Sequence, residues 1–136
     1  MKSFIQYITE VEDWNEQITS DEHGNQYRVK DLYDYAKSCK TCYHAEFPIK
    51  QTDGLHWWEK NYSMDNPKHV ERMKQADTSF PILGIRTSDS DTVSVADGLN
   101  RIKKAHTLED KTTVPAYIIN MDKVAHLAIK PSKNPD

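Results

Sequence analysis

The fold is set by residues 80–120, which read FPILGIRTSDSDTVSVADGLNRIKKAHTLEDKTTVPAYIIN. Two apolar runs in this stretch predict β-strands at 81–85 and 92–96, and the second run alternates apolar and polar side chains, as a strand with one buried face does. A helix is expected from 99 to 108, and a third strand from 113 to 119. Strands and a helix in this order predict an α+β domain with a small mixed sheet.

The sequence around this stretch predicts further elements from local signals. The apolar spacing within residues 4–14 predicts a helix, and the run at 21–25 is a strong turn signal that predicts a β-hairpin. Asn66-Pro67 predicts a sharp helix start, because asparagine caps helices and proline suits their first turn. The remaining predictions are a helix over 31–43, a short strand at 47–49, either a helix start or an aromatic plug at 55–58, and a short helix over 121–129.

The junction Asp97-Gly98 carries the main chemical signal of the sequence. A strand that ends here and runs directly into a helix aims unpaired backbone N–H groups at one point, and the helix dipole favours an anion there. Arg101 stands in the first helical turn, where a guanidinium can bind a phosphate. We expect Arg101 to be exposed, so that its removal weakens ligand binding more than folding. Since Asp-Gly is also a common turn signal, the alternative is that Asp97 simply caps the helix.

A series of short motifs runs through the same stretch. It consists of Pro81-Ile82-Leu83-Gly84, Val93-Ser94-Val95, Asp97-Gly98-Leu99-Asn100-Arg101, Ala105 and Val114-Pro115-Ala116. This order, with residues 47–49 and the 70–77 helix as a lead-in, resembles the ParB/sulfiredoxin-like superfamily over roughly residues 47–120. The resemblance implies a ParB/sulfiredoxin-like domain over 46–130, an N-terminal extension of helix and hairpin over 1–45, and a frayed tail over 131–136.

The resemblance also implies a phosphate-binding loop of the D-G-x-H-R type. By that comparison the backbone faces the phosphates at Gly98, Leu99 and Asn100. Arg101 then neutralises the phosphates, and Asp97 orients the loop. The expected ligand-binding set is completed by Lys104, His56 and His69, and the expected catalytic residues, if the protein is an enzyme, are Asp97, Asn100 and Arg101.

Two departures from the family pattern leave catalysis open. The family histidine is Asn100 here, and asparagine can neither carry a charge nor transfer a proton near neutral pH. The cysteine that sulfiredoxin uses is Leu99, which argues against sulfinic-acid reduction. We therefore expect a module that binds a nucleotide or a host protein; the alternative is an active phosphotransferase, nucleoside triphosphate hydrolase or ParB-like nuclease. The opening MKSFIQYITE resembles small accessory proteins of large tailed phages, so a viral accessory protein is expected.

Composition and charge limit the expected partners. The chain of 136 residues has a formal charge of −3 and a pI of about 6.1, which argues against non-specific nucleic-acid binding. No long apolar run predicts a membrane span, and residues 1–14 do not resemble a secretory signal, so a cytoplasmic location is expected, in the host cell if the protein is viral. The expected partners are a nucleotide or phosphorylated small molecule and a host protein. No cofactor or metal site is assigned, but a bound nucleoside triphosphate would bring Mg²⁺, for which Asp97 is the best-placed carboxylate.

Two further features each have a structural and a functional interpretation. Cys39 and Cys42 form a CxxC pair, which we expect to be two reduced thiols, because a zinc site needs about four ligands. A half site completed by a partner chain is the alternative. The run His56-Trp57-Trp58 can stack a nucleobase, but adjacent tryptophans more often divide between core and surface, and we expect that division here.

Overall fold

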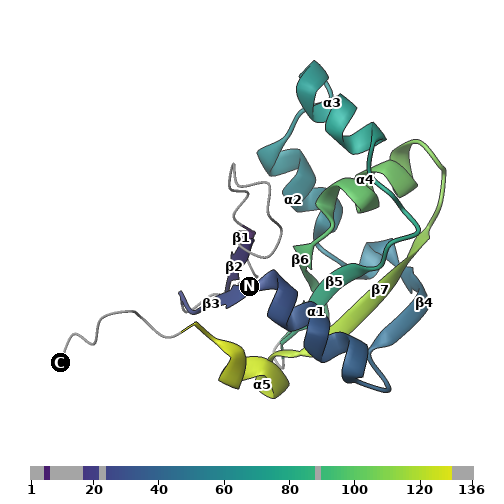
Figure 1. The fold of residues 1–136 in the computed structure, drawn as a ribbon. Coiled ribbons are helices and arrows are strands. Elements are labelled where there is room, and N and C mark those ends of the chain that lie inside the picture. The colour runs from purple at the N-terminus through teal and green to yellow at the C-terminus, as the bar shows by residue number, and fades with distance from the viewer. Residues whose placement is uncertain (1–4, 7–16, 22–23, 88–89, 130–136) are drawn as a thin grey trace.

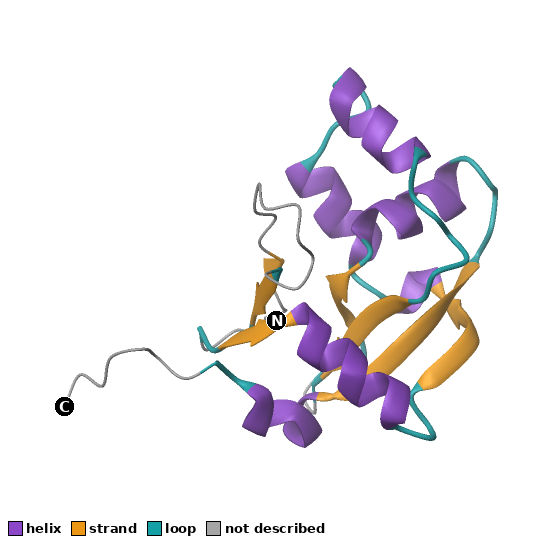
Figure 2. Cartoon of the chain, viewed as in Figure 1, coloured by secondary structure: helices purple, strands orange, loops and turns teal. Residues whose placement is uncertain are grey.

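A four-stranded mixed sheet forms the centre of the fold in the computed structural model, which describes residues 5–6, 17–21, 24–87 and 90–129 (Figures 1 and 2). Its strands are β4 (Tyr43–Pro48), β5 (Ile82–Arg86), β6 (Ser94–Asp97) and β7 (Thr113–Asn120). Their spatial order is β4-β7-β5-β6, in which β7 pairs antiparallel with β4 and parallel with β5, and β5 pairs antiparallel with β6. The α+β class expected from the sequence is therefore confirmed.

The helices divide between the two faces of this sheet (Figure 1). One face carries α2 (Gly54–Asn61), α3 (Pro67–Lys74) and α4 (Leu99–Thr107), and the other carries α1 (Val29–Ser38) and α5 (Met121–Val124). Two 3-10 turns, η2 (Ile49–Gln51) and η3 (Ala125–Leu127), follow β4 and α5. A smaller antiparallel sheet of β1 (Ile5–Gln6), β2 (Ile18–Ser20) and β3 (Gln26–Arg28) lies beside β6. In the part of the chain that the structure describes, no helix has the length and apolar character needed to cross a bilayer.

The central sheet separates two hydrophobic clusters, because successive residues of a strand point to opposite faces. In β5, Ile82 belongs to the cluster on the α2–α4 side, which contains Trp58, whereas Leu83 and Ile85 belong to the cluster on the α1 side, which contains Leu32. These five side chains are at most 1% exposed. Burial of one such side chain stabilises the fold by about 1.5–3 kcal/mol, so both helical layers are held firmly against the strands that lead to Gly98.

Helix α3 begins where the sequence predicts it. Asn66 Oδ1 accepts the backbone N–H of Lys68 at 2.9 Å, and Pro67 occupies the first turn. The predicted hairpin is present as β2 and β3, and the strands and helix expected within residues 80–120 are present as β5, β6, α4 and β7. These elements carry their own start and stop signals, so local sequence is enough to predict them.

The predicted helix over residues 4–14 is wrong where the structure can be compared with it. Ile5–Gln6 is strand β1, in which Ile5 pairs with Ser20 of β2. The rest of that prediction, like the predicted tail over 131–136, lies outside the described residues.

Two other predicted helices are too long. The helix expected over 31–43 begins at Val29 and ends at Ser38, and Tyr43 instead pairs with Tyr117 in the sheet. The helix expected over 121–129 ends at Val124, after which the chain turns until Ile129 bridges to β3. In both places, pairing with a strand distant in sequence outweighs the local helical pattern.

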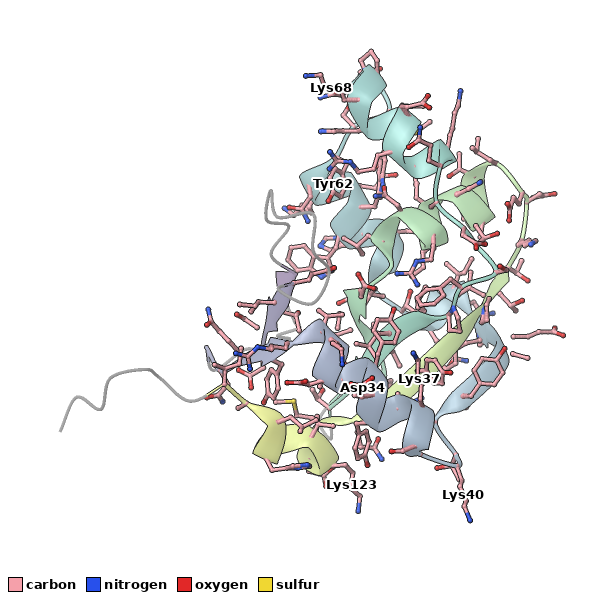
Figure 3. The ribbon with its side chains drawn as sticks, viewed as in Figure 1. Asp34, Lys37, Lys40, Tyr62, Lys68 and Lys123 are labelled. Atoms are coloured by element: carbon pink, nitrogen blue, oxygen red, sulfur yellow. A yellow bond between two sulfur atoms is a disulfide. The ribbon has the colours of Figure 1, made fainter. Side chains whose placement is uncertain are left out.

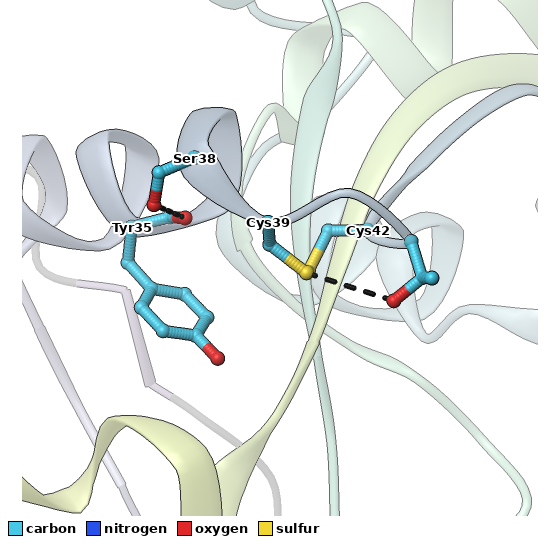
Figure 4. Close-up of a disulfide and its surroundings, with 5 residues drawn as sticks. Tyr35, Ser38, Cys39 and Cys42 are labelled. Atoms are coloured by element: carbon cyan, nitrogen blue, oxygen red, sulfur yellow. Dashed lines mark hydrogen bonds between the residues drawn. A yellow bond between two sulfur atoms is a disulfide. The ribbon is translucent and has the colours of Figure 1, made fainter.

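The CxxC pair is a disulfide, so the prediction of two reduced thiols is wrong (Figure 4). Cys39 caps the C-terminus of α1, and its backbone N–H donates to the carbonyl of Ala36 at 3.1 Å. The tight turn that follows places the Cα atoms of Cys39 and Cys42 5.5 Å apart, within the usual range for a disulfide. The carbonyl of Cys42 accepts the N–H of Ile118 at 2.8 Å, which ties the turn to β7.

Reduction of this disulfide is expected to lower the free energy of unfolding by less than about 3 kcal/mol, because the bond closes a very short loop. Urea unfolding with and without a phosphine reductant measures the difference. The double variant Cys39→Ser/Cys42→Ser is the control, and it should match the reduced protein and ignore the reductant. Loss of cooperative unfolding on reduction would show that the disulfide is instead a main determinant of the fold.

Candidate ligand-binding site at the start of helix α4

The chain reverses sharply between β6 and α4, and Gly98 makes this reversal possible. Its φ of 115° and ψ of 23° lie in the left-handed region that side chains disfavour. A Cβ atom at this position would also lie 2.7 Å from Ile82 Cγ2 of the neighbouring strand. The turn therefore sets the last residue of β6, Asp97, directly beside the first turn of α4.

The first turn of α4 offers unpaired hydrogen-bond donors. No side chain among the described residues caps it, and the first backbone N–H to bond within the helix is that of Ile102, which donates to the carbonyl of Gly98 at 3.0 Å. The N–H groups of Leu99, Asn100 and Arg101 have no partner inside a helix of this geometry. They stand at the positive end of the helix dipole, which favours a negatively charged group.

These donors border a pocket of about 340 Å³, here called the α4 pocket. Its walls are the Asp97–Arg101 loop, Tyr62 at the end of α2, and residues of the connection from α3 to β5, among them Asp77 and Phe80. A second hollow of about 380 Å³ adjoins it and shares Asp97, Arg101 and Phe80. The volumes suit one small ligand, since such sites usually measure roughly 300–1,000 Å³.

Arg101 is not the exposed cation that the sequence predicts. Its side chain is only 14% exposed, and Nη2 forms an ion pair with Asp97 Oδ2 at 2.8 Å. Nη1 donates to the carbonyl of Pro81 at 2.6 Å and to the hydroxyl of Tyr33 at 3.3 Å. The guanidinium also stacks 5.0 Å from the ring centre of Phe80. Arg101 therefore joins α4 to β5 and α1, and its fixed position is part of the fold.

The protonation states of this network are stable near neutral pH. Burial works against the charge of Arg101, but Tyr33 and Asp97 outweigh it, so the pKa of Arg101 lies above its ordinary value. Burial, followed by the charge of Asp97, raises the pKa of Tyr33 far above that of a free tyrosine. The pair is therefore an arginine cation beside a neutral phenol, and neither group is poised to exchange a proton at pH 7.

Asp97 is the centre of the same network. Oδ1 accepts from Nε2 of Gln17 at 2.8 Å, and Oδ2 accepts from the hydroxyl of Tyr33 at 2.8 Å in addition to Arg101. Gln17 and Tyr33 precede Asp97 by 80 and 64 residues, and sequence reasoning missed both because no local motif connects them. With both oxygens engaged, Asp97 holds the loop to α1 and to the segment before β2, in keeping with the orienting role expected for it.

Asn100 is held by a buried tryptophan. Its Oδ1 accepts from Nε1 of Trp58 at 2.8 Å, and Trp58 itself is 1% exposed. The side-chain NH₂ of Asn100 finds no acceptor among the described residues, so it adds a neutral donor to the lining of the pocket. The expected division of the tryptophans is confirmed, since Trp58 lies in the core and Trp57 is half-buried beside His56.

Tyr62 contributes a buried hydroxyl to the pocket wall. It follows α2 and lies beneath α3 (Figure 3), where its ring contacts those of Trp58 and His69 at centre distances of 5.5 and 5.0 Å. Its hydroxyl oxygen is buried and has no hydrogen-bond partner among the described residues. Burial raises the pKa of Tyr62, so the group stays a neutral phenol. An unsatisfied buried hydroxyl typically costs about 1–3 kcal/mol.

The structure does not bring the other expected ligand-binding residues into the lining of the pocket. Lys104 donates from Nζ to the carbonyls of Lys74 and Ala76, both at 2.8 Å, and so closes the C-terminus of α3. His69 Nδ1 accepts the backbone N–H of Ser63 at 3.0 Å, and the ring of His69 packs edge-on against the ring of Tyr62. His56 is exposed on α2 and packs its ring against that of Trp57.

Asp77 is a lining residue that sequence reasoning missed. It is exposed at the pocket wall, and Oδ1 accepts from both the backbone N–H and the hydroxyl of Ser79. These hydrogen bonds, with smaller contributions from Lys104 and Arg101, lower the pKa of Asp77 and keep it ionised at neutral pH. Its sequence signal, an Asp-Thr-Ser turn, is common to many turns that bind nothing.

Carboxylates near the pocket are too few to form a metal centre of their own. Among residues 5–6, 17–21, 24–87 and 90–129, no group of three or more His, Cys, Asp or Glu side chains is placed to share a metal ion. Asp97, the carboxylate expected to meet Mg²⁺, has both oxygens bonded within the fold. Asp77 is the better-placed carboxylate, because its Oδ2 makes no hydrogen bond or ion pair with the described residues.

The geometry thus amounts to a small pocket with backbone and side-chain amide donors at the start of α4, beside a fixed arginine–aspartate pair. The similarity to the ParB/sulfiredoxin-like superfamily rests on sequence motifs alone and stays a prediction. Comparison of the chain with protein-family models, with curated proteins and with solved structures finds no match.

Proposed function

We propose that the protein is a binding module for a nucleotide or another phosphorylated small molecule, and that the α4 pocket receives the phosphate group. The observation that carries the proposal is a set of donors around one cavity that find no acceptor among the described residues: the first-turn amides of α4 and the NH₂ of Asn100. Oxygen acceptors of a phosphate suit such donors, and the helix dipole adds to the attraction. The ParB/sulfiredoxin-like motif order supports the same assignment for this loop.

Binding is favoured over catalysis because the charged groups of the loop are engaged within the fold. Asp97 accepts hydrogen bonds at both oxygens, and Arg101 is held by Asp97, Tyr33 and Pro81. Asn100, at the position of the family histidine, cannot transfer a proton. Neither Asp97 nor Asn100 supplies the free general base that a hydrolase or nuclease would use, and Asp77 is the remaining carboxylate of the described lining.

The role of a phage accessory protein with a host-protein partner stays a prediction. It rests on the first ten residues, of which the structure describes only Ile5–Gln6. A cytoplasmic location, expected from the lack of a long apolar run and of a secretory signal in the sequence, also stays a prediction.

Asn100→Asp is the variant that tests the proposed site. The new carboxylate can still accept the N–H of Trp58, and an acidic residue in a first helical turn is favourable, so folding should be unaffected. The change removes the NH₂ donor and places a negative charge in the pocket. Loss of one charge-assisted hydrogen bond costs about 1.5–3 kcal/mol, so affinity should fall at least roughly tenfold.

The measurement is a thermal-shift screen of nucleotides with and without Mg²⁺, followed by calorimetric titration of each ligand that raises the melting temperature. Asn120→Asp is the matched control, because it adds the same charge at an exposed position at the end of β7. It should bind like the parent protein. Equal affinity of Asn100→Asp and the parent, or no ligand among the nucleotides, would refute the α4 pocket as a phosphate site.

A further inference from the structure

The charges around the α4 pocket limit which phosphate group it can hold. Among the described lining residues, the ionised side chains are Asp77, Asp97 and Arg101, which leaves one net negative charge. Arg101 and Asp97 neutralise each other across 2.8 Å. Asp77 faces the pocket as a second carboxylate, with its pKa lowered by Ser79. The lining therefore repels a highly charged anion, even though its neutral donors favour an acceptor.

The nearest lysines do not supply the missing positive charge as ligand donors. Lys104 offsets part of the field of Asp77, but its Nζ is directed at the carbonyls of Lys74 and Ala76. Lys103 forms an ion pair with Glu59 at 2.6 Å and lies 4.7 Å above the ring of Trp58. The attraction that remains comes from neutral hydrogen bonds and the helix dipole, which is equivalent to about half an elementary charge.

We propose that the group bound in the α4 pocket carries a single negative charge, as a nucleoside phosphodiester does, and is not a terminal phosphate. This inference rests on the proposed function of the pocket. A terminal phosphate carries about −1.5 to −2 at pH 7, and a triphosphate carries more. Each meets Asp77 in a described lining whose one cation, Arg101, is already paired with Asp97. Arg72 of α3 lies outside that lining and acts on Tyr62 through its charge. One negative charge is matched by the helix terminus and by the neutral NH₂ donor of Asn100.

Phe80 indicates that the ligand has a nucleoside part. Its ring is 45% exposed, unusually so for a phenylalanine, and it borders both the α4 pocket and the adjoining hollow. One side of the ring is occupied by the guanidinium of Arg101, and Tyr33 lies at a tilt to it. A base next to the phosphate can stack on such an exposed ring, as bases do in single-strand binding sites.

The test compares 3′,5′-cyclic monophosphates with 5′-monophosphates of the same four bases, by calorimetric titration at pH 7.5 without Mg²⁺. The cyclic ester, with one negative charge, is expected to bind at least about tenfold more tightly than the 5′-monophosphate. Asp77→Asn should raise the affinity for the 5′-monophosphate more than the affinity for the cyclic ester, and so bring the ratio of the two affinities closer to one. Asparagine can still accept from Ser79, which preserves the turn. Asp65→Asn, at an exposed carboxylate outside the lining, is the control and should leave the ratio unchanged.

Binding of each probe is assigned to the α4 pocket by its loss in Asn100→Asp. A 5′-monophosphate that binds there as tightly as the cyclic ester, or a ratio that Asp77→Asn leaves unchanged, overturns the single-charge inference and leaves the proposed function standing. No binding sensitive to Asn100→Asp overturns both. A linear dinucleotide is the last probe. If the dinucleotide binds as tightly as the cyclic ester, the ligand of the pocket is a phosphodiester of a nucleic-acid strand. If the dinucleotide binds more weakly, the ligand is a small cyclic nucleotide.

Discussion

Asp97→Ala is expected to lower the free energy of unfolding by about 3 kcal/mol or more, because it leaves the guanidinium of Arg101 buried without its counter-charge. The substitution also removes the acceptor of the Tyr33 and Gln17 hydrogen bonds, which join the loop to α1 and to the segment before β2. Chemical denaturation monitored by tryptophan fluorescence measures the loss. The three tryptophans make this signal available in the native chain.

Lys30 and Asp34 in α1 provide a matched control. They form an ion pair at the same i,i+4 spacing and the same 2.8 Å distance, but their side chains are 44% and 54% exposed. Asp34→Ala should therefore cost only about 0.5 kcal/mol or less. If Asp97→Ala and Asp34→Ala destabilise the protein equally, the arginine–aspartate pair does not hold the fold. The sequence predicts that removal of Arg101 affects ligand binding more than folding. Because its side chain is in fact largely buried, Arg101→Ala should also lower the melting temperature of the protein.

Gly98→Ala is expected to destabilise the protein by roughly 2–5 kcal/mol, combining a left-handed backbone with an overpacked core. The added Cβ would lie 2.7 Å from Cγ2 and 2.9 Å from Cβ of Ile82, and Ile82 is itself completely buried. Because Cβ of Ile82 is bonded directly to the backbone of β5, it cannot move away unless the strand moves with it. Gly98 should therefore tolerate even the smallest side chain poorly.

Gly24→Ala separates the two contributions. Gly24 also has a positive φ, of 83°, but an added Cβ there meets nothing within 4 Å. Its substitution should cost only the backbone strain, about 1–2 kcal/mol. Urea unfolding of both variants checks the difference, and equal losses would mean that the contact with Ile82 relaxes freely.

The sequence predicts the parts of this fold that are encoded locally. The strands and helix of residues 80–120 follow from short apolar runs and from the Asp97-Gly98 turn, and the start of α3 follows from Asn66-Pro67. The same local signals predict that a strand ends at Asp97 and that a helix begins directly after Gly98, as β6 and α4 do. These signals could not reveal that Trp58 fixes the orientation of Asn100, since these residues are 42 positions apart.

The incorrect predictions share a physical cause, which is that long-range contacts decide them. Arg101 has the sequence position of an exposed first-turn cation, but Asp97 and Tyr33 bury it. Cys39 and Cys42 lack further zinc ligands, but the turn after α1 brings them close enough to bond to each other. Spacing along a chain reports neither burial nor the direction of a turn, so these features become visible only in the folded structure.

The place of β7 at the middle of the central sheet has a consequence for the order in which the chain folds. Among the strands that the structure describes, β7 is synthesised last, yet it lies between β4 and β5 and pairs with both. A ribosome-bound chain that has not yet released residues 113–120 holds β4 without a neighbour and β5 with one open side. Pairings such as Tyr43 with Tyr117 must therefore form late and across a long loop, which slows folding and leaves strand edges open to other chains until residues 113–120 have emerged.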